Sequence, residues 1–355
     1  MNNIVSVSGF GWSGSGAVID LLSEYEDLEI FARENGDTHE ISLLCEKDGI
    51  YDLDFYLNTK WSRIGSSDAI ISFRELLSFL TKKGYENLFN GKFMKLSEAY
   101  LDSLIDYSFD GWTFRDERKP AKGLKKVVVY NNIIAHIFAN RWTRHIPQSV
   151  RLKKKLSKKV YHKIEVSYRP DSFDKKTREY ITSLFSAGRR NADIPLVVDQ
   201  FYPADNPRPF MKYLPESKVI IVRRDPIDTY LLAKCALDYF KVPLPIDNVN
   251  DYVTYYREVI GKTRIEDNDT VLSVQFEDLI YKYDETVKII ESFLGVSKHT
   301  NKMGAFDPKV SINNTQLVTR YPQYHREVEF IRKELAPYLY DFGQNQFERK
   351  TSKVF

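Results

Sequence analysis

The sequence has few cysteines and lacks a long apolar segment. Its two cysteines, Cys45 and Cys235, lie far apart in a chain of 355 residues. We therefore expect no disulfide framework, and we expect the protein to reside in a reducing compartment. No apolar run reaches the length of a membrane-spanning helix, and no signal-peptide pattern precedes the first apolar segment. These absences predict a cytoplasmic protein without a transmembrane segment.

A strong excess of one charge is also missing. Lysine and arginine number 52 against 49 aspartates and glutamates, a net charge of +3. This slight basic excess fits an anionic ligand but gives no argument for a nucleic-acid partner. The histidines His136, His145 and His162 are scattered, without the spacing of metal ligands, so no metal is expected.

The apolar pattern predicts one α/β domain over residues 1–355. Hydrophobic residue types make up 43 % of the chain, enough for a sizeable core. We expect strands at residues 3–8, 28–32, 195–199, 218–222 and 270–276. We expect helices at residues 15–25, 225–240, 249–263, 282–294 and 325–337. Helices alternating with apolar strands indicate a three-layer fold, a parallel sheet flanked by helices.

Residues 40–190 interrupt this alternation. Helical patterns occupy residues 68–84 and 177–190, and the length of the apolar stretch 125–142 favours a helix over a strand. We interpret residues 40–190 as a large, mainly helical insertion into the sheet domain, and we expect it to shape the acceptor site.

A glycine-rich segment lies directly between the first strand and the first helix. It reads Gly9-Phe10-Gly11-Trp12-Ser13-Gly14-Ser15-Gly16. Such a loop lets backbone N–H groups approach a phosphate at the start of a helix, so the fold is P-loop-like, although a tight turn that binds nothing is the alternative. A P-loop phosphotransferase would carry Gly-Lys-Ser/Thr where this chain has Gly14-Ser15-Gly16, and the lysine is missing.

Two further segments carry polar residues at strand ends. Arg224 follows the strand at 218–222, and Asp225-Pro226 then opens a helix. The strand at 270–276 leads into Phe276-Glu277-Asp278-Leu279 and a helix that ends in Phe293-Leu294-Gly295. Ligands of open α/β sheets collect at the carboxyl ends of strands, where Arg224 is suited to hold a phosphate.

Together, in this order, the three segments resemble the sulfotransferases that use 3′-phosphoadenosine-5′-phosphosulfate (PAPS), a bacterial carbohydrate-type member in particular. The resemblance covers about residues 3–34 and 195–296. It implies sulfuryl transfer from PAPS as co-substrate, without a metal, to a hydroxyl or amine of an acceptor. It implies donor binding by Gly11, Trp12, Ser13, Gly14, Ser15, Gly16 and Arg224, with Thr229 or Tyr230 as a substitute contact.

Two positions depart from the family pattern. Trp12 stands where the family has lysine or arginine, and Leu232 stands where it has a serine eight residues after the arginine. The family's cation stabilises the leaving oxygen, which Trp12 cannot do. Arg33 is the predicted substitute. The alternatives are a nucleotide-binding protein that has lost catalysis and a P-loop phosphotransferase.

The resemblance also implies a base that takes the proton of the acceptor. In several branches of the family this is a glutamate just after the second strand, here Glu34, with His39 as the substitute and Glu40 close behind. Asp199, at the end of another strand, is expected to face the same crevice, where it orients the acceptor or caps the next turn.

The predicted acceptor is a glycan or another hydroxyl compound. Five lysines between residues 153 and 159, and the segment Asn140–His145 with two arginines and a tryptophan, form basic stretches. They indicate either a solvated helix face or an acidic or lipid-linked acceptor, the latter with a protein peripheral to the membrane.

Overall fold

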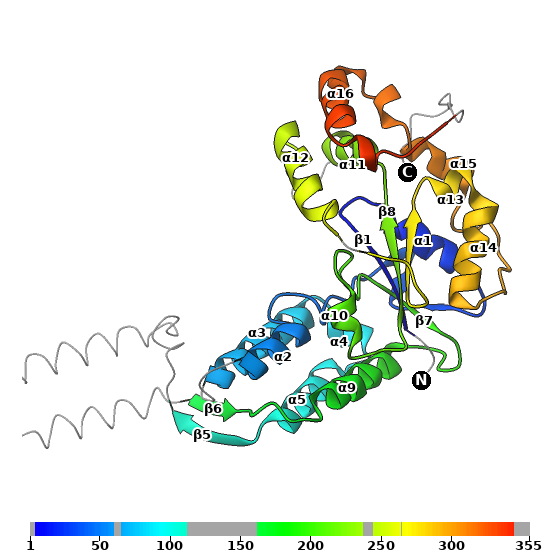
Figure 1. Cartoon of the computed structure of the whole chain (residues 1–355). Coiled ribbons are helices and arrows are strands. Elements are labelled where there is room, and N and C mark those ends of the chain that lie inside the picture. The colour runs from blue at the N-terminus through cyan, green and yellow to red at the C-terminus, as the bar shows by residue number, and fades with distance from the viewer. Residues whose placement is uncertain (1–3, 60–64, 112–161, 237–243, 264, 344–355) are drawn as a thin grey trace, which may run out of the picture. The chain divides into compact units, whose positions relative to one another are not determined.

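The computed structural model describes residues 4–59, 65–111, 162–236, 244–263 and 265–343 (Figure 1). The chain divides into two compact units. The first unit comprises residues 1–46 and 182–355, and the second unit comprises residues 47–181.

The first unit is built on a five-stranded parallel sheet with the strand order β2-β7-β1-β8-β9 (Figure 1). In this order the strands are Glu29–Ile30, Leu196–Asp199, Ile4–Gly9, Lys218–Arg223 and Val271–Gln275. The central strands β1 and β8 are buried over nearly their whole length, as continuous apolar strands of a parallel sheet are. The five predicted strands and their parallel arrangement are confirmed.

The strands end together at one edge of the sheet. In the pairing of β1 with β8, Gly9 lies opposite Val222, and in the pairing of β1 with β7, Val7 lies opposite Asp199. The segments after β1, β7 and β8 therefore emerge side by side. This is the edge at which α/β sheets bind ligands.

The two faces of β1 have different neighbours. Its valines belong to a core shared with helices α1 (Ser15–Leu22) and α14 (Tyr283–Leu294). Its serines alternate with them and bond the chain after β7: Ser8 Oγ donates to the carbonyl oxygen of Tyr202 at 2.7 Å, and Ser6 Oγ accepts from the Tyr202 amide at 3.1 Å. The sheet is thus covered on both faces.

A second core of the first unit lies among three helices after β8. These are α11 (Pro226–Leu231), α12 (Val249–Tyr255) and α16 (His325–Glu334). The first two continue as π-helical turns, Leu232–Ala236 and Tyr256–Ile260. The predicted helices of this region are confirmed, the first of them as far as the structure describes it.

The second unit is mainly helical. Its elements are α2 (Ile50–Thr59), α3 (Ser66–Lys82), α4 (Tyr85–Leu88), α5 (Phe93–Leu104), the antiparallel pair β5 (Tyr107–Gly111) and β6 (His162–Val166), and the start of α9 (Phe173–Gly188). Helices α3 and α9 confirm the helices expected at residues 68–84 and 177–190. The helix expected at 125–142 and the basic stretches at 140–145 and 153–159 lie outside the described residues.

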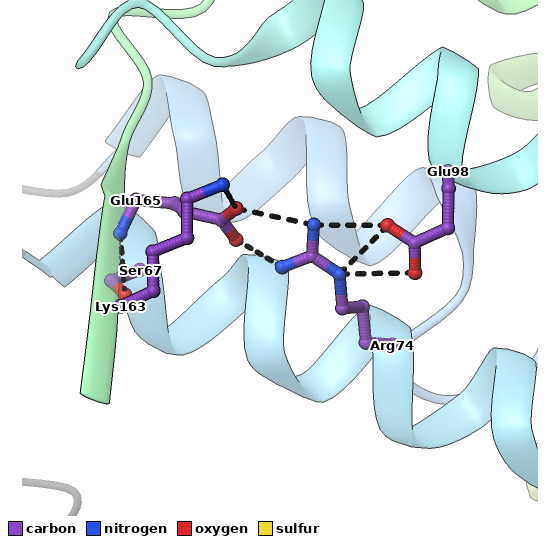
Figure 2. Close-up of polar contacts among 5 residues, drawn as sticks. All are labelled: Ser67, Arg74, Glu98, Lys163 and Glu165. Carbon is purple, nitrogen blue, oxygen red and sulfur yellow. Dashed lines mark hydrogen bonds and ion pairs between the residues drawn. The ribbon is translucent and has the colours of Figure 1, made fainter. Parts of the chain in front are cut away.

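An ion network in which only the Glu165 side chain is buried joins three elements of the second unit (Figure 2). Arg74 of α3 donates from Nε to both carboxylate oxygens of Glu98 on α5, at 3.0 and 3.1 Å, and also bonds the carboxylate of Glu165 on β6. Lys163 reaches the same Glu165 at 3.0 Å, and the Glu165 amide donates to Ser67 Oγ. One guanidinium thereby ties two helices to the β5–β6 pair.

Candidate active site

The glycine loop connects β1 to α1 through two residues in left-handed backbone conformation. Trp12 has a φ of 65° and Gly14 a φ of 88°. A Cβ atom at position 14 would lie 2.6 Å from the Phe276 ring, so only glycine fits there. Gly14 is the N-cap of α1 and no side chain caps this helix. The first N–H groups of α1 are therefore suited to an anion.

The loop also has a buried hydroxyl that bonds to no acceptor in the described part of the chain. Ser13 is 3 % exposed, and its Oγ has no hydrogen-bond partner among the described residues. A Cβ atom at Gly9 would clash with this Oγ, so the Ser13 hydroxyl can occupy its position only because residue 9 has no side chain. A buried unpaired hydroxyl is costly, and a ligand oxygen would satisfy it.

Gln200, which follows β7, ties the loop to the neighbouring strand. Its carboxamide accepts from the Gly9 amide and donates to Ser15 Oγ, each at 3.3 Å. Its φ of 53° places it in the left-handed region. Gln200 was not predicted as a site residue from the sequence, although its position directly after Asp199 at the end of a strand was an available signal.

Arg224 connects the loop to the far wall of the site. Its Nη1 donates to the carbonyl oxygen of Trp12 at 3.2 Å and its Nη2 to the carbonyl oxygen of Asn314. Its guanidinium stacks on the Phe276 ring, 4.8 Å from the centroid. The side chain is buried, and its Nε has no hydrogen-bond partner within the described chain. Burial lowers the pKa of Arg224, yet a guanidinium stays charged in proteins.

Three buried carboxylates surround Arg224. Asp225 caps α11 by accepting from the Ile227 amide at 2.8 Å, and Asp228 accepts from two amides of the segment after Asn314, each at 2.7 Å. Burial, followed by the charge of Asp225, raises the pKa of Asp228 to about 7 and that of Glu277 to about 8. Asp228 and Glu277 are thus at least partly protonated at neutral pH, and burial raises the pKa of Asp225 as well.

These elements border a cavity of about 1200 Å³. The predicted donor residues that line it are Gly11, Trp12, Ser13, Gly14, Ser15, Gly16 and Arg224. The predicted contact Thr229 is buried on α11 and is not among the lining residues in the described part of the chain. Along the described walls Arg224 is the one cationic side chain, whereas Asp20, Glu40 and Asp307 contribute carboxylates.

Trp12 and Leu232, the two departures from the family pattern, lie in the same surroundings. Both line the cavity, and both belong to the apolar core of α11, α12 and α16, Leu232 as a member and Trp12 packed against it. An apolar surface therefore stands where the family has a cation and a hydroxyl.

The three predicted catalytic residues lie at the β3–β4 hairpin or just after it, β3 being Arg33–Glu34 and β4 Asp37–Thr38. Glu34 and His39 are exposed. Arg33 donates from Nη2 to Asp20 Oδ1 at 2.8 Å and lines a separate cavity of about 390 Å³. The described walls of the large cavity include none of the three.

Asp199 ends β7 beside this hairpin. Its Oδ2 accepts from Thr38 Oγ1 at 3.1 Å, while its Oδ1 has no partner among the described residues. Burial, followed by the nearby charge of Glu40, raises the pKa of Asp199 to about 7. Glu40, two residues after the hairpin, lines the cavity, whereas Asp199 is not among its lining residues in the described chain.

In the described ranges, His, Cys, Asp and Glu form no group of three or more that could hold a metal ion. None of the described helices is both long and apolar enough to cross a membrane.

Comparison with known proteins identifies one family. Residues 137–300 match the Sulfotransferase family. This range contains Arg224 and the segment from Phe276 to Gly295, whereas the glycine loop precedes it. No curated protein is significantly similar to the chain.

Solved structures show only distant likeness. The sulfotransferase domain of the Synechococcus PCC 7002 olefin synthase has 12% identity and a TM-score of 0.34, with 89% of each chain covered. The sulfotransferase domain from the curacin biosynthetic pathway has 13% identity and a TM-score of 0.35, covering 95% of this chain and 98% of that one. Sulfotransferase STF1 from Mycobacterium tuberculosis H37Rv has 13% identity and a TM-score of 0.33, covering 95% and 77%. The likeness to the sulfotransferase family therefore rests on the sequence match over residues 137–300, and the description of the fold rests on the sheet itself.

Proposed function

Because residues 137–300 match the sulfotransferase family, we propose that the protein transfers a sulfuryl group from PAPS to a hydroxyl or amine of a carbohydrate acceptor. The observation that carries the proposal is the hydrogen bond from Arg224 to the Trp12 carbonyl, which joins the two phosphate-type loops in one cavity. PAPS supplies the sulfuryl group and leaves as a bisphosphate.

The residues of the cavity fit such a donor. The unpaired hydroxyl of Ser13 and the first N–H groups of α1 offer donors to the 5′-phosphosulfate. The unpaired Nε of Arg224 offers a charged donor to the 3′-phosphate. The volume of about 1200 Å³ exceeds that of a typical small-molecule site, which leaves room for an acceptor beside the nucleotide.

For the chemical step we propose Glu34 as the base and Arg33 as the cation that replaces the family's loop lysine, with His39 as the substitute base. Glu34 lies on a hairpin whose other residues reach Asp20 and Asp199. Hydrogen bonds of catalytic groups often tighten only when the substrate is bound, so the exposure of Glu34 without ligand does not count against it.

The test is calorimetric titration with 3′,5′-adenosine bisphosphate, followed by assay of [³⁵S]PAPS with a panel of saccharides. We expect Arg224→Ala to weaken nucleotide binding by about 10- to 100-fold, since a charge-assisted hydrogen bond contributes about 1.5–3 kcal/mol. Arg208→Ala is the control, because Arg208 is exposed and pairs only with Glu266 in the described chain. Absence of nucleotide binding by the unmodified protein would overturn the proposal.

A second candidate is nucleotide binding without catalysis. It is favoured by one observation, that Arg224 is the sole cation on the described walls of the cavity. Tight binding of the bisphosphate without sulfuryl transfer to any member of the panel would establish it. Binding of ATP that depends on Mg²⁺ would instead point to a phosphotransferase.

A further inference from the structure

Glu24, just beyond the carboxyl end of α1, is a fully buried carboxylate with four hydrogen-bond donors. Its Oε1 accepts from the amides of Ala305 and Phe306 at 2.9 and 2.8 Å. Its Oε2 accepts from the Met303 amide at 3.2 Å and lies 2.6 Å from His299 Nε2. The Glu24 side chain is 0% exposed. A carboxylate bonded this completely fixes the backbone that surrounds it.

The donors belong to the segment that forms one wall of the large cavity. Residues 303–307 line the cavity consecutively, and Asn314 lines it farther along the same segment. The predicted catalytic residues are not among the described lining residues. Glu24 is buried and is not among the described residues that line the cavity, but it accepts hydrogen bonds from the backbone amides of this wall. Helix α1 thus carries the glycine loop at its amino end and, just past its carboxyl end, the anchor of the 303–307 wall.

His299 makes the anchor rigid. Its ring stacks on Tyr25 with a centroid distance of 4.3 Å and an interplanar angle of 18°, and the Tyr25 hydroxyl donates to Glu291 at 3.0 Å. His299 Nδ1 is buried and has no partner in the described part of the chain. His299 therefore donates from Nε2 to the Glu24 carboxylate, which holds the ring in place between Glu24 and Tyr25.

We propose that Glu24, together with His299, is a positioning residue for the nucleotide. Its carboxylate sets the course of residues 303–306 and so the width of the cavity between this wall and the glycine loop. The inference deepens the proposed function and rests on it for the identity of the ligand. The anchor itself is a property of the protein and can be measured without the ligand.

The test variant is Glu24→Gln, which keeps the shape but turns one acceptor oxygen into an NH₂ group facing donors. We expect faster hydrogen exchange of the Met303, Ala305 and Phe306 amides. We also expect an affinity for 3′,5′-adenosine bisphosphate about tenfold weaker and, in the PAPS assay, a raised KM at nearly unchanged kcat.

Asp27→Asn is the matched control. Asp27 also accepts from two backbone amides of the same segment, those of Ser297 and Lys298, at 3.0 and 3.2 Å. Neither residue lines the cavity in the described chain. A general loosening of the segment would change nucleotide affinity in both variants, whereas the proposal expects the change for Glu24→Gln alone.

Each outcome decides the proposal. Unchanged exchange and affinity in Glu24→Gln overturn it, and so do equal losses of affinity in the two variants. If the unmodified protein binds no nucleotide, the proposed function fails, and the exchange of the three amides still decides whether the anchor exists. If Glu24→Gln does not fold, His299→Gln, which keeps a donor near Nε2, and His299→Leu, which removes it, take its place. The first should bind like the unmodified protein and the second should not.

Discussion

Arg224 donates a hydrogen bond to the carbonyl oxygen of Trp12, 3.2 Å away, across 212 positions of the chain. The bond fixes the loop after β8 to the loop after β1 through backbone, so it does not depend on which side chain stands at position 12. The indole of Trp12 packs against the core of α11, α12 and α16. The loop therefore keeps its shape although the family's cation is missing.

Gly14→Ala tests whether the shape of the loop matters for binding. A Cβ there meets the Phe276 ring at 2.6 Å in a backbone with φ of 88°, so we expect a loss of about 1–3 kcal/mol in stability and at least about tenfold in nucleotide affinity. Gly36→Ala is the control, because its φ is 93° but nothing lies within 4 Å. Urea unfolding and calorimetry measure the two effects. Equal stability losses in both variants would show that φ alone matters and that the contact with Phe276 does not.

Glu34→Gln tests the proposed base. We expect kcat for sulfuryl transfer to fall by about 10²- to 10⁴-fold with nucleotide affinity unchanged, the usual contribution of a positioned base. Glu40→Gln is the comparison, because Glu40 follows the hairpin and lines the cavity, whereas Glu34 lies on β3 and is not among the described lining residues. We expect it to raise the KM of the acceptor instead. The reverse pattern would assign the base to Glu40, and a loss only in His39→Asn would assign it to His39.

The sequence predicted the parts of the site that depend on local pattern. Glycines between a strand and a helix, and an arginine directly after a strand, meet at one edge because every strand of the sheet is parallel. Contacts between residues that are far apart in the sequence leave no local sequence pattern from which they could be predicted. Gln200 reaches Gly9 across 191 positions and Glu24 reaches Phe306 across 282. The sequence marked Trp12 as a departure but could not indicate which core receives its indole.

The order of the strands was likewise beyond the sequence. The connection from β1 to β2 is short, yet β7 lies between these two strands and pairs with both. The chain reaches β7 only after the second unit, residues 47–181. A connection of that length does not predict the position in the sheet that the strand after it takes. For the same reason Asp199, at the end of β7, could be expected at this edge, but its hydrogen bond with Thr38 could not.

Glu277→Gln should change the pH dependence of stability. Burial raises the pKa of Glu277 to about 8 in the folded protein, against about 4.3 in an unfolded chain. Between these values the unfolded state loses the proton first, so stability falls as the pH rises, by up to about 1.4 kcal/mol per pH unit. Glutamine imitates the protonated form and can still accept from the Asp225 amide, which Glu277 Oε1 does at 2.9 Å.

We therefore expect the variant to gain stability relative to the unmodified protein at pH 8 and to match it near pH 4. Urea unfolding across this range measures the effect. Glu285→Gln, an exposed change on α14, is the control and should leave the slope unaltered. Parallel curves for Glu277→Gln and the unmodified protein would mean that the pKa of Glu277 is the same in the folded and the unfolded state.

Arg33→Gln and Trp12→Arg together test which residue supplies the missing cation. If Arg33 stabilises the leaving oxygen, Arg33→Gln should lower kcat by about 10²-fold, as removal of one such donor does elsewhere. Trp12→Arg should then restore much of that loss in the double variant, although the single change costs stability because the indole leaves its apolar core. Arg190→Gln is the control, since Arg190 lines the same small cavity as Arg33 but is 80% exposed and pairs with Glu29 instead of Asp20. The opposite result would be a higher kcat in Trp12→Arg and an unchanged kcat in Arg33→Gln. It would mean that neither Arg33 nor another cation stabilises the leaving oxygen in the natural protein, because a second arginine would raise kcat little if one were already in place.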